Sequence, residues 1–278
     1  MDITIPLFSE IYLKIGPVST NGESYPTSRL QKGLILISNG QELAEEGVGF
    51  GVPVLKLGVK TIFPGWVELS CKDDGSRQEI SAKFILNLEE RITGHGLGSI
   101  KSRPLYQIKN YLADLYRRSP PTRGPLLVIS NALRSSFGWQ TTYEDAGYSH
   151  KVKVNYTVDC HTGIIAVAVD TAGLVEDGVT ELILMNEQGA RNFDRYSDSS
   201  GLDLEGEEIG SWNEVTAERA SFLSYAHRLA FTLPQIKGAR LFRGREFIGS
   251  RLAWSGFGYS IPPGLERFSY TLSIERLP

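Results

Sequence analysis

The feature that most constrains the fold of this chain is a long succession of short apolar or alternating runs, each broken by glycine, proline or polar turn residues. Each run has the length of a β-strand. In the run 82–92 the apolar side chains fall mostly on even positions, as in Phe84, Leu86 and Leu88, which is typical of a half-buried antiparallel strand. A total of roughly 16 to 20 such runs predicts an all-β protein.

The expected strands share this length and are bounded by turn residues; they are 11–15, 33–38, 51–57, 60–63, 66–71, 82–92, 126–130, 133–139, 151–158, 164–169, 179–185, 220–225, 228–233, 239–242, 246–254 and 268–274. The turn 160–163 joins two of them into a predicted hairpin. The glycine-rich stretch 47–53 indicates a bulged or tightly bent strand, or else a place where the backbone closely approaches a ligand.

One segment, 106–118, has apolar residues at offsets of three and four and predicts a helix that ends before Pro120. The proline-rich stretch 119–125 that follows is the one plausible internal join. The pattern as a whole therefore predicts a single domain over 1–278. We expect a large antiparallel two-sheet β-sandwich, with one packed helix near 106–118.

Charge and motif content exclude several classes of function. The 278 residues carry 29 basic and 32 acidic side chains, which leaves no large positive field for nucleic acid. The start shows no secretory pattern and no apolar run is long enough to span a bilayer, so we expect a cytoplasmic protein without a membrane partner. No phosphate-binding loop or dinucleotide motif is present, and we expect no cofactor. The cysteines Cys71 and Cys160 are expected to be free thiols.

The four histidines are scattered singly and suggest no metal site. His95 lies in a glycine-rich loop, where functional residues are common. The loop 186–208 is the most suggestive segment, because its amides, carboxylates (Asp194 among them) and guanidinium groups suit vicinal hydroxyls or acid-base chemistry. It has three interpretations: a solvated acidic loop, a sugar contact, or a calcium loop over 194–208 that lacks the known ligand spacing.

A late segment mixes aromatic and charged residues. On a strand, Arg243 and Arg245 point to one side and Glu246 to the other, so the arginines form a surface suited to a carboxylate. Trp254 and Tyr259 offer flat faces for stacking a sugar ring, or alternatively belong to the core. A similar mixture of aromatic and charged residues lies in the middle of the chain, where the candidates are Arg134, Trp139 and Tyr143, followed by Glu144 and Asp145.

Taken together, the many short strands, the central helix, the pair Asn186–Glu187 after a strand and the late motif 254–259 resemble the galactose mutarotase-like supersandwich superfamily. The resemblance implies sugar binding along a concave sheet. It also implies either an epimerase with a histidine acid and a glutamate base, or a polysaccharide lyase with tyrosine or histidine beside arginine or asparagine. No histidine of this chain matches the epimerase motif, so a sugar-binding sheet without epimerisation stays open.

Under the epimerase hypothesis, Glu187 is the expected base and His95 or His150 the expected acid. Under the lyase hypothesis Arg243 and Arg245 neutralise a uronate carboxylate, while Tyr148 or Tyr259 moves the proton. The predicted function is thus a carbohydrate-binding protein or carbohydrate-active enzyme, with a sugar or polysaccharide as ligand. The alternative is a non-catalytic structural or interaction protein.

Overall fold

The computed structural model describes residues 2–17, 26–93, 140–174, 178–248, 251–265 and 267–278. These residues form antiparallel sheets throughout, which confirms the predicted all-β class. The predicted helix 106–118, the join 119–125, the strands 126–130 and 133–139, and the candidates His95, Arg134 and Trp139 lie outside the described residues. Within the described ranges, no helix has the length and apolar character needed to cross a membrane.

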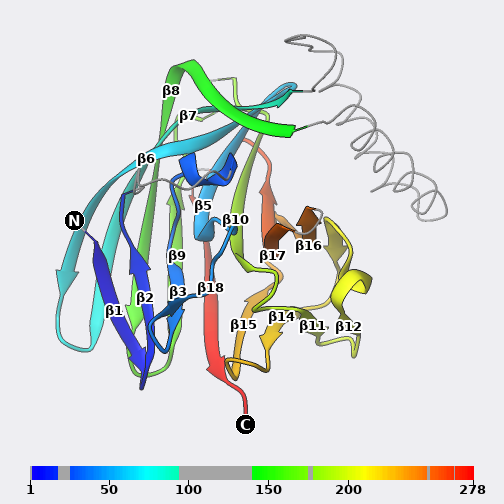
Figure 1. The fold of residues 1–278 in the computed structure, drawn as a ribbon. Coiled ribbons are helices and arrows are strands. Elements are labelled where there is room, and N and C mark those ends of the chain that lie inside the picture. Colours follow the sequence, from blue (N-terminus) through cyan, green and yellow to red (C-terminus); the bar gives the residue numbers. More distant parts are fainter. Residues whose placement is uncertain (1, 18–25, 94–139, 175–177, 249–250, 266) are drawn as a thin grey trace.

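The strands of the smaller sheet are β1 (Ile3–Phe8), β2 (Ile11–Ile15), β3 (Ile35–Ser38) and β4 (Gln41–Glu42), in that order. Those of the larger sheet are β5 (Gly49–Leu57), β6 (Lys60–Asp73), β7 (Arg77–Thr93), β8 (Gln140–Asp159), β9 (Ile164–Asp170), β10 (Glu181–Gly189), β11 (Arg195–Asp198), β12 (Asp203–Glu205), β13 (Asn213–Val215), β14 (Arg219–Ser224), β15 (Leu229–Pro234), β16 (Arg240–Ile248), β17 (Arg251–Ile261) and β18 (Arg267–Arg276). Their order in the sheet is β12-β11-β14-β15-β18-β9-β8-β7-β6-β5-β10-β17-β16-β13 (Figure 1). The described residues also include the short 3-10 helices η1 (Pro26–Arg29) and η3 (Gly206–Ile209).

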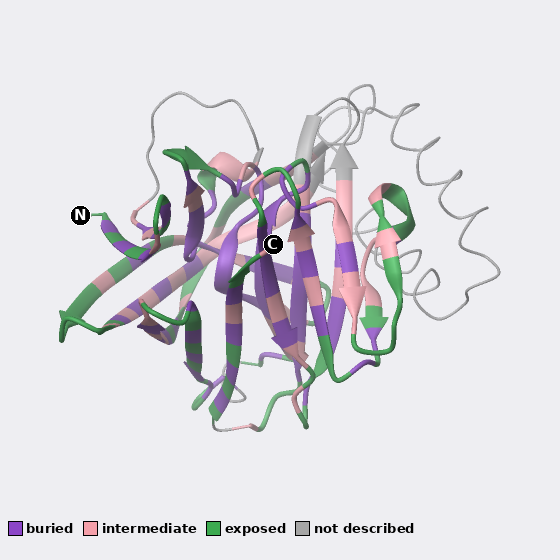
Figure 2. Cartoon of the chain, turned by 90° about the horizontal axis from the view of Figure 1, so that it is seen from below, coloured by how far each residue is buried: buried purple, intermediate pink, exposed green. Residues whose placement is uncertain are grey.

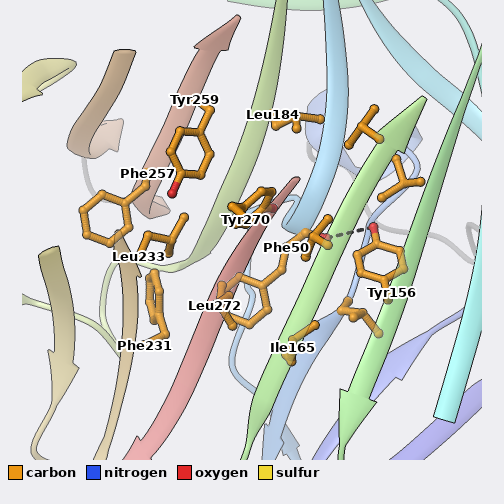
Figure 3. Close-up of a cluster of buried hydrophobic side chains, with 14 of the residues drawn as sticks. Phe50, Tyr156, Ile165, Leu184, Phe231, Leu233, Phe257, Tyr259, Tyr270 and Leu272 are labelled. Carbon is orange, nitrogen blue, oxygen red and sulfur yellow. Dashed lines mark hydrogen bonds between the residues drawn. The ribbon is translucent and has the colours of Figure 1, made fainter. Parts of the chain in front are cut away.

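The larger sheet curls over so that its two halves face each other across one core. The rings of Phe257 on β17 and Phe231 on β15 lie 5.9 Å apart, although β18, β9, β8, β7, β6, β5 and β10 separate these strands in the sheet. Tyr259 on β17 and Tyr270 on β18 are 4.8 Å apart in the same way (Figure 3). Burying one such aromatic side chain contributes about 1.5–3 kcal/mol. These contacts therefore hold the two halves of the sheet together.

A bulge at Gly51 decides which side chains of β5 face this core. Met185 of β10 pairs with Val52, and the next residue of β10 pairs with Phe50, so Gly51 is the extra residue. Its φ of +74° is in the left-handed region that favours glycine. The hydroxyl of Tyr156 donates to the carbonyl oxygens of Phe50 and Gly51, at 3.1 Å each (Figure 3). The bulged strand predicted over 47–53 is confirmed.

Most strand predictions that fall on described residues are confirmed, with two differences. The hairpin of β8 and β9 pairs Val158 with Ile165, as expected from its turn. The runs 60–63 and 66–71 belong to one strand, β6, which continues through register shifts around Pro64. The single strand predicted for 246–254 is wrong, because this run contains the end of β16 and the start of β17, which pair with each other. Periodicity alone does not reveal such a reversal inside an apolar run.

Candidate functional site

The alternation of β10 turns three consecutive polar residues to opposite sides of the sheet. Asn186 faces the core, where its Oδ1 accepts hydrogen bonds from the Gly51 N–H (3.1 Å) and the Tyr270 hydroxyl (2.6 Å). Gln188 also faces the core, and its Oε1 accepts a bond from the Leu36 N–H at 3.3 Å. Glu187 between them points to the other side. These bonds fix the strand on both sides of Glu187.

Glu187 is buried on this second side, and one of its carboxyl oxygens has no hydrogen-bond partner among the described residues. Its exposed fraction is 2 %, and Oε2 accepts a bond from the Val48 N–H at 3.4 Å. Oε1 has no hydrogen-bond partner among the described residues. Burial raises the pKa of the Glu187 carboxyl from its ordinary 4.5 to about 8; the Val48 N–H opposes the rise and the charge of Glu246 adds to it. Glu187 therefore keeps its proton at neutral pH and can donate a hydrogen bond.

A second carboxyl group with a raised pKa lies close by. The Glu45 side chain packs over Gly189, which follows Glu187 on the same side of β10. Its Oε1 accepts a bond from the Asn192 amide at 3.4 Å, and its Oε2 has no hydrogen-bond partner among the described residues. Burial raises the pKa of the Glu45 carboxyl, while Arg191 and Lys32 lower it.

Two tryptophans meet beside these carboxyl groups. Trp254 pairs with Gly189 in the ladder of β10 and β17. Trp254 is therefore the diagonal neighbour of Glu187, and such neighbours are about 7–8 Å apart, within reach of a large aromatic side chain. The ring of Trp212 lies 5.0 Å from that of Trp254, at 43°. Gly244 and Gly258 make room for both, because a Cβ at either position would lie within 3 Å of an indole ring. Both tryptophans are half-buried.

The backbone of Trp212 has a φ of +55°, which is uncommon for an aromatic residue and costs about 1–3 kcal/mol. Strain of this kind clusters at binding and catalytic sites, where the surrounding structure supports it. The positive φ of Trp212 therefore indicates that the surrounding structure keeps this residue in place against a backbone cost.

Tyr143 is a further buried polar residue near these carboxyl groups. It is buried, and its ring contacts that of Phe63 edge-on at 5.1 Å. Burial raises the pKa of the Tyr143 hydroxyl well above its ordinary value, and the charges of Glu90, Glu187, Glu246 and then Glu46 add to the rise.

We call the side of β5, β10, β17 and β16 that bears Glu187, Trp254 and Glu246 the Glu187 face. Apolar side chains pack around it, namely Leu30, Val48, Val52, Val54 and Met185, with Phe63, Leu88, Ile183 and Trp212 against them.

The predicted arginine pair lies on the opposite side of the sheet. Arg243 and Arg245 share one side of β16, and Glu246 lies on the other, as the alternation predicts. Arg243, however, pairs with the core residue Phe257 and places its guanidinium 4.5 Å from the ring of Tyr196. Arg245 donates to the carbonyl oxygen of Ala190 at 3.1 and 3.3 Å. Arg243 and Arg245 therefore do not share a side of the sheet with Glu187 and Trp254.

The remaining candidates are dispersed. Tyr259 is fully buried in the core, and its hydroxyl donates to the Pro234 carbonyl oxygen at 2.5 Å, so it offers no surface to a sugar. His150 lies on β8 with its ring 5.5 Å from Tyr148, over which the ammonium of Lys60 lies at 5.2 Å. Asp194 lies near the guanidinium of Arg245 and raises its pKa, against the larger lowering by burial.

The acidic loop 194–208 shows no metal-binding geometry. In the described residues, no group of three or more His, Cys, Asp or Glu side chains could hold a metal ion. Asp198 instead accepts bonds from the Tyr196 hydroxyl at 2.7 Å and the Ser200 N–H at 2.9 Å, which organises the turn. The carboxylate of Glu205 pairs with Arg195 at 2.7 Å.

Sequence reasoning found Glu187, Glu246, Trp254 and Tyr143 but missed Trp212 and Glu45. Trp212 stands alone in its segment and gave no signal. Glu45 lies two residues before the glycine-rich stretch that forms the bulge of β5, and an acidic residue near a predicted backbone approach was a usable hint.

No family model and no curated protein sequence matches this chain. Among the solved structures that are similar to it, three align over 99 % of its length. The α-N-acetylgalactosaminidase NagBb of Bifidobacterium bifidum, solved with GalNAc, aligns with 8 % identity and a TM-score of 0.50. The protein HI1317 aligns over 100 % of its own length with 9 % identity and a TM-score of 0.35. A galactose mutarotase-like protein from Lactobacillus casei aligns over 99 % of its length with 12 % identity and a TM-score of 0.38.

One of these three structures is a galactose mutarotase-like protein, the kind of protein that the sequence resembles. The match to the glycosidase shows a shared fold alone, since only 8 % of residues are identical. The chain spans 36 % of the length of that protein.

Proposed function

We propose that this protein binds a sugar on the Glu187 face and that Glu187 donates a proton or hydrogen bond there. It would then be a carbohydrate-binding protein or a carbohydrate-active enzyme. The observation that carries this proposal is the placement of a buried carboxyl group, with one oxygen unpartnered in the described structure, as diagonal neighbour of a paired tryptophan. The fold shared with a glycosidase that was solved with a bound sugar supports the same class of ligand.

The chemistry of a sugar fits both halves of this arrangement. Indole rings accept the apolar C–H face of a pyranose, and two rings at 43° offer contact from two directions. The hydroxyl groups and the ring oxygen of the sugar then form hydrogen bonds with the carboxyl groups of Glu187 and Glu45. A protonated Glu187 donates to an acceptor oxygen, which an ionised carboxylate cannot do.

If the protein catalyses ring opening, Glu187 gives its proton to the ring oxygen as the bond from that oxygen to the anomeric carbon breaks. A base takes the anomeric hydroxyl proton, and a carbonyl forms at that carbon. Glu246, which lies on the same face, is the proposed base. Glu187 thus takes the acid role in place of the base role expected from the sequence, because burial keeps its proton in place. We do not retain the lyase variant, because Arg243 and Arg245 lie on the other side of the sheet.

Binding is tested by thermal shift of the full chain against neutral sugars, phosphosugars and uronates, with Trp254→Ala as the site variant. Trp66→Ala is the matched control, because Trp66 is an exposed tryptophan on β6. A ligand that binds the folded state raises the melting temperature. We expect one sugar class to raise it in the wild type and in Trp66→Ala but not in Trp254→Ala. Equal shifts in both variants for every sugar class would place sugar binding away from the Glu187 face. No shift at millimolar concentrations would favour the non-catalytic alternative.

Turnover is tested separately by polarimetry of freshly dissolved anomers of the bound sugar. Glu187→Gln keeps the shape of the side chain and removes the acidic proton. We expect this variant to retain binding and to lose at least tenfold in rate, in line with the typical contribution of a general acid of about 100-fold or more. An unchanged rate would remove Glu187 from the mechanism while leaving the binding claim intact.

A further inference from the structure

A groove away from Glu187 and Trp254 is framed by turns from both sheets. Its volume is about 270 Å³, and it is lined by the segments 9–11, 38–39, 226–228 and 276–277. These are the β1–β2 turn, the β3–β4 turn, the β14–β15 turn and the end of β18, which lie toward the lower end of Figure 1. Figure 2 views the molecule from this end, with the C-terminus near the middle. None of these segments belongs to the Glu187 face.

The four segments are tied to one another. The Asn39 N–H donates to the Glu10 carbonyl oxygen at 3.0 Å, and the Leu277 N–H donates to that of Arg228 at 2.9 Å. The guanidinium of Arg276 donates to the carbonyl oxygen of Ser9. Glu10, Asn39 and Arg228 all have positive φ, at 64°, 51° and 52°. A frame held by bonds between its turns presents its side chains in fixed positions, which lowers the entropy cost of binding.

One part of the groove lining carries cationic side chains that can donate hydrogen bonds to an anion. Arg228 and Arg276 are both lining residues of the groove. The Arg228 side chain is exposed and forms no hydrogen bond or ion pair with another described residue, whereas Arg276 uses one nitrogen for Ser9. Two arginines lining one small volume suit a carboxylate, which guanidinium groups bind through charge-assisted hydrogen bonds.

The other part accepts hydrogen bonds. The Asn192 amide nitrogen donates to the Leu43 carbonyl oxygen at 3.0 Å, so its Oδ1 is the atom that faces His227 Nε2, 3.1 Å away. Nε2 therefore carries the hydrogen, and burial lowers the pKa of His227, which keeps the ring neutral at neutral pH. Nδ1 is then an acceptor. The carboxylate of Glu10 on the groove wall is a second acceptor, without a hydrogen bond or ion pair to another described side chain.

We propose that this groove is a second binding site, independent of the Glu187 face, for a small hydroxylated carboxylate such as a sugar acid. The carboxylate meets Arg228 and Arg276, and the hydroxyl groups donate to His227 and Glu10. The volume lies just below the roughly 300–1,000 Å³ of drug-sized sites, which limits the ligand to about one monosaccharide.

The test is a calorimetric titration of the full chain with D-glucuronate and with D-glucose, which differ only in the carboxylate at C6. The site variant is Arg228→Gln, and the matched control is Arg219→Gln, an exposed arginine on β14 outside the groove. We expect D-glucuronate to bind the wild type and Arg219→Gln alike, and Arg228→Gln roughly tenfold more weakly, as for one charge-assisted bond. D-Glucose should bind at least tenfold more weakly than D-glucuronate.

The variant Glu187→Gln separates this proposal from the proposed function. D-Glucuronate binding should be unchanged in Glu187→Gln and in Trp254→Ala, because the groove contains neither residue. Equal affinity of Arg228→Gln and wild type would overturn the proposal, as would equal affinity for the two sugars or no binding of D-glucuronate at millimolar concentration. Loss of binding in Trp254→Ala alone would assign the sugar acid to the Glu187 face and also overturn it.

Discussion

Replacing Glu187 by glutamine should change how the stability of the protein depends on pH. The folded-state pKa of Glu187 is about 8 and its ordinary value is 4.5. The folded state therefore holds the proton more tightly than the unfolded state does, and the associated stability is present in full below about pH 4.5. It is lost as pH rises from there through the folded-state pKa near 8. Glutamine does not titrate, so Glu187→Gln escapes this loss.

The magnitude follows from the same two values. A pKa difference of one corresponds to about 1.4 kcal/mol, so the full shift is worth about 5 kcal/mol. Between pH 5 and pH 9 the wild type should lose about 4 kcal/mol of unfolding free energy relative to Glu187→Gln. Urea denaturation at several pH values measures this difference, with Glu79→Gln as control, since Glu79 is exposed on β7. A difference between wild type and Glu187→Gln that stays constant from pH 5 to pH 9 would refute the burial argument.

The remaining predictions concern the bulge that positions Val48 opposite Glu187. Gly51→Ala should destabilise the fold by about 2–4 kcal/mol, because a Cβ there would lie 2.6 Å from the ring of Tyr156 and the φ is +74°. Gly58→Ala is the matched control, with a φ of +59° and open space around its Cβ; it should cost only about 1 kcal/mol in the same urea titrations, and equal losses would count against the steric account. Tyr156→Phe should cost about 1–3 kcal/mol, because the hydroxyl bonds to the carbonyl oxygens of Phe50 and Gly51 disappear; thermal unfolding with no loss would contradict this.

Local pattern predicted the strands and the facing of side chains within them. The alternation of β16 correctly placed Arg243 and Arg245 opposite Glu246, and the glycines of 47–53 correctly indicated a bulge. Alternation also separates Trp254 from Tyr259, which lie on opposite sides of β17 because their numbers differ by five. One of the two was therefore bound to face the core.

The composition of the Glu187 face could not be predicted, because it depends on pairings between distant segments. The neighbourhood of Glu187 and Trp254 exists only in the register that pairs Gly189 with Trp254, and a shift of one residue would turn Trp254 to the core. Trp212 lies in the segment between η3 and β13, and the space that it occupies depends on Gly244 of β16 and Gly258 of β17. A single sequence carries no signal for such long-range register.

The most direct test of sugar binding on the Glu187 face is to observe the indole N–H signals of the four tryptophans by NMR while a sugar that raises the melting temperature is added. Single tryptophan-to-phenylalanine variants assign the signals. Binding on this face predicts that the signals of Trp212 and Trp254 shift together and saturate at one dissociation constant, while that of Trp66, 51 % exposed on β6, stays in place. A shift of Trp66 with Trp212 and Trp254 unmoved would contradict it.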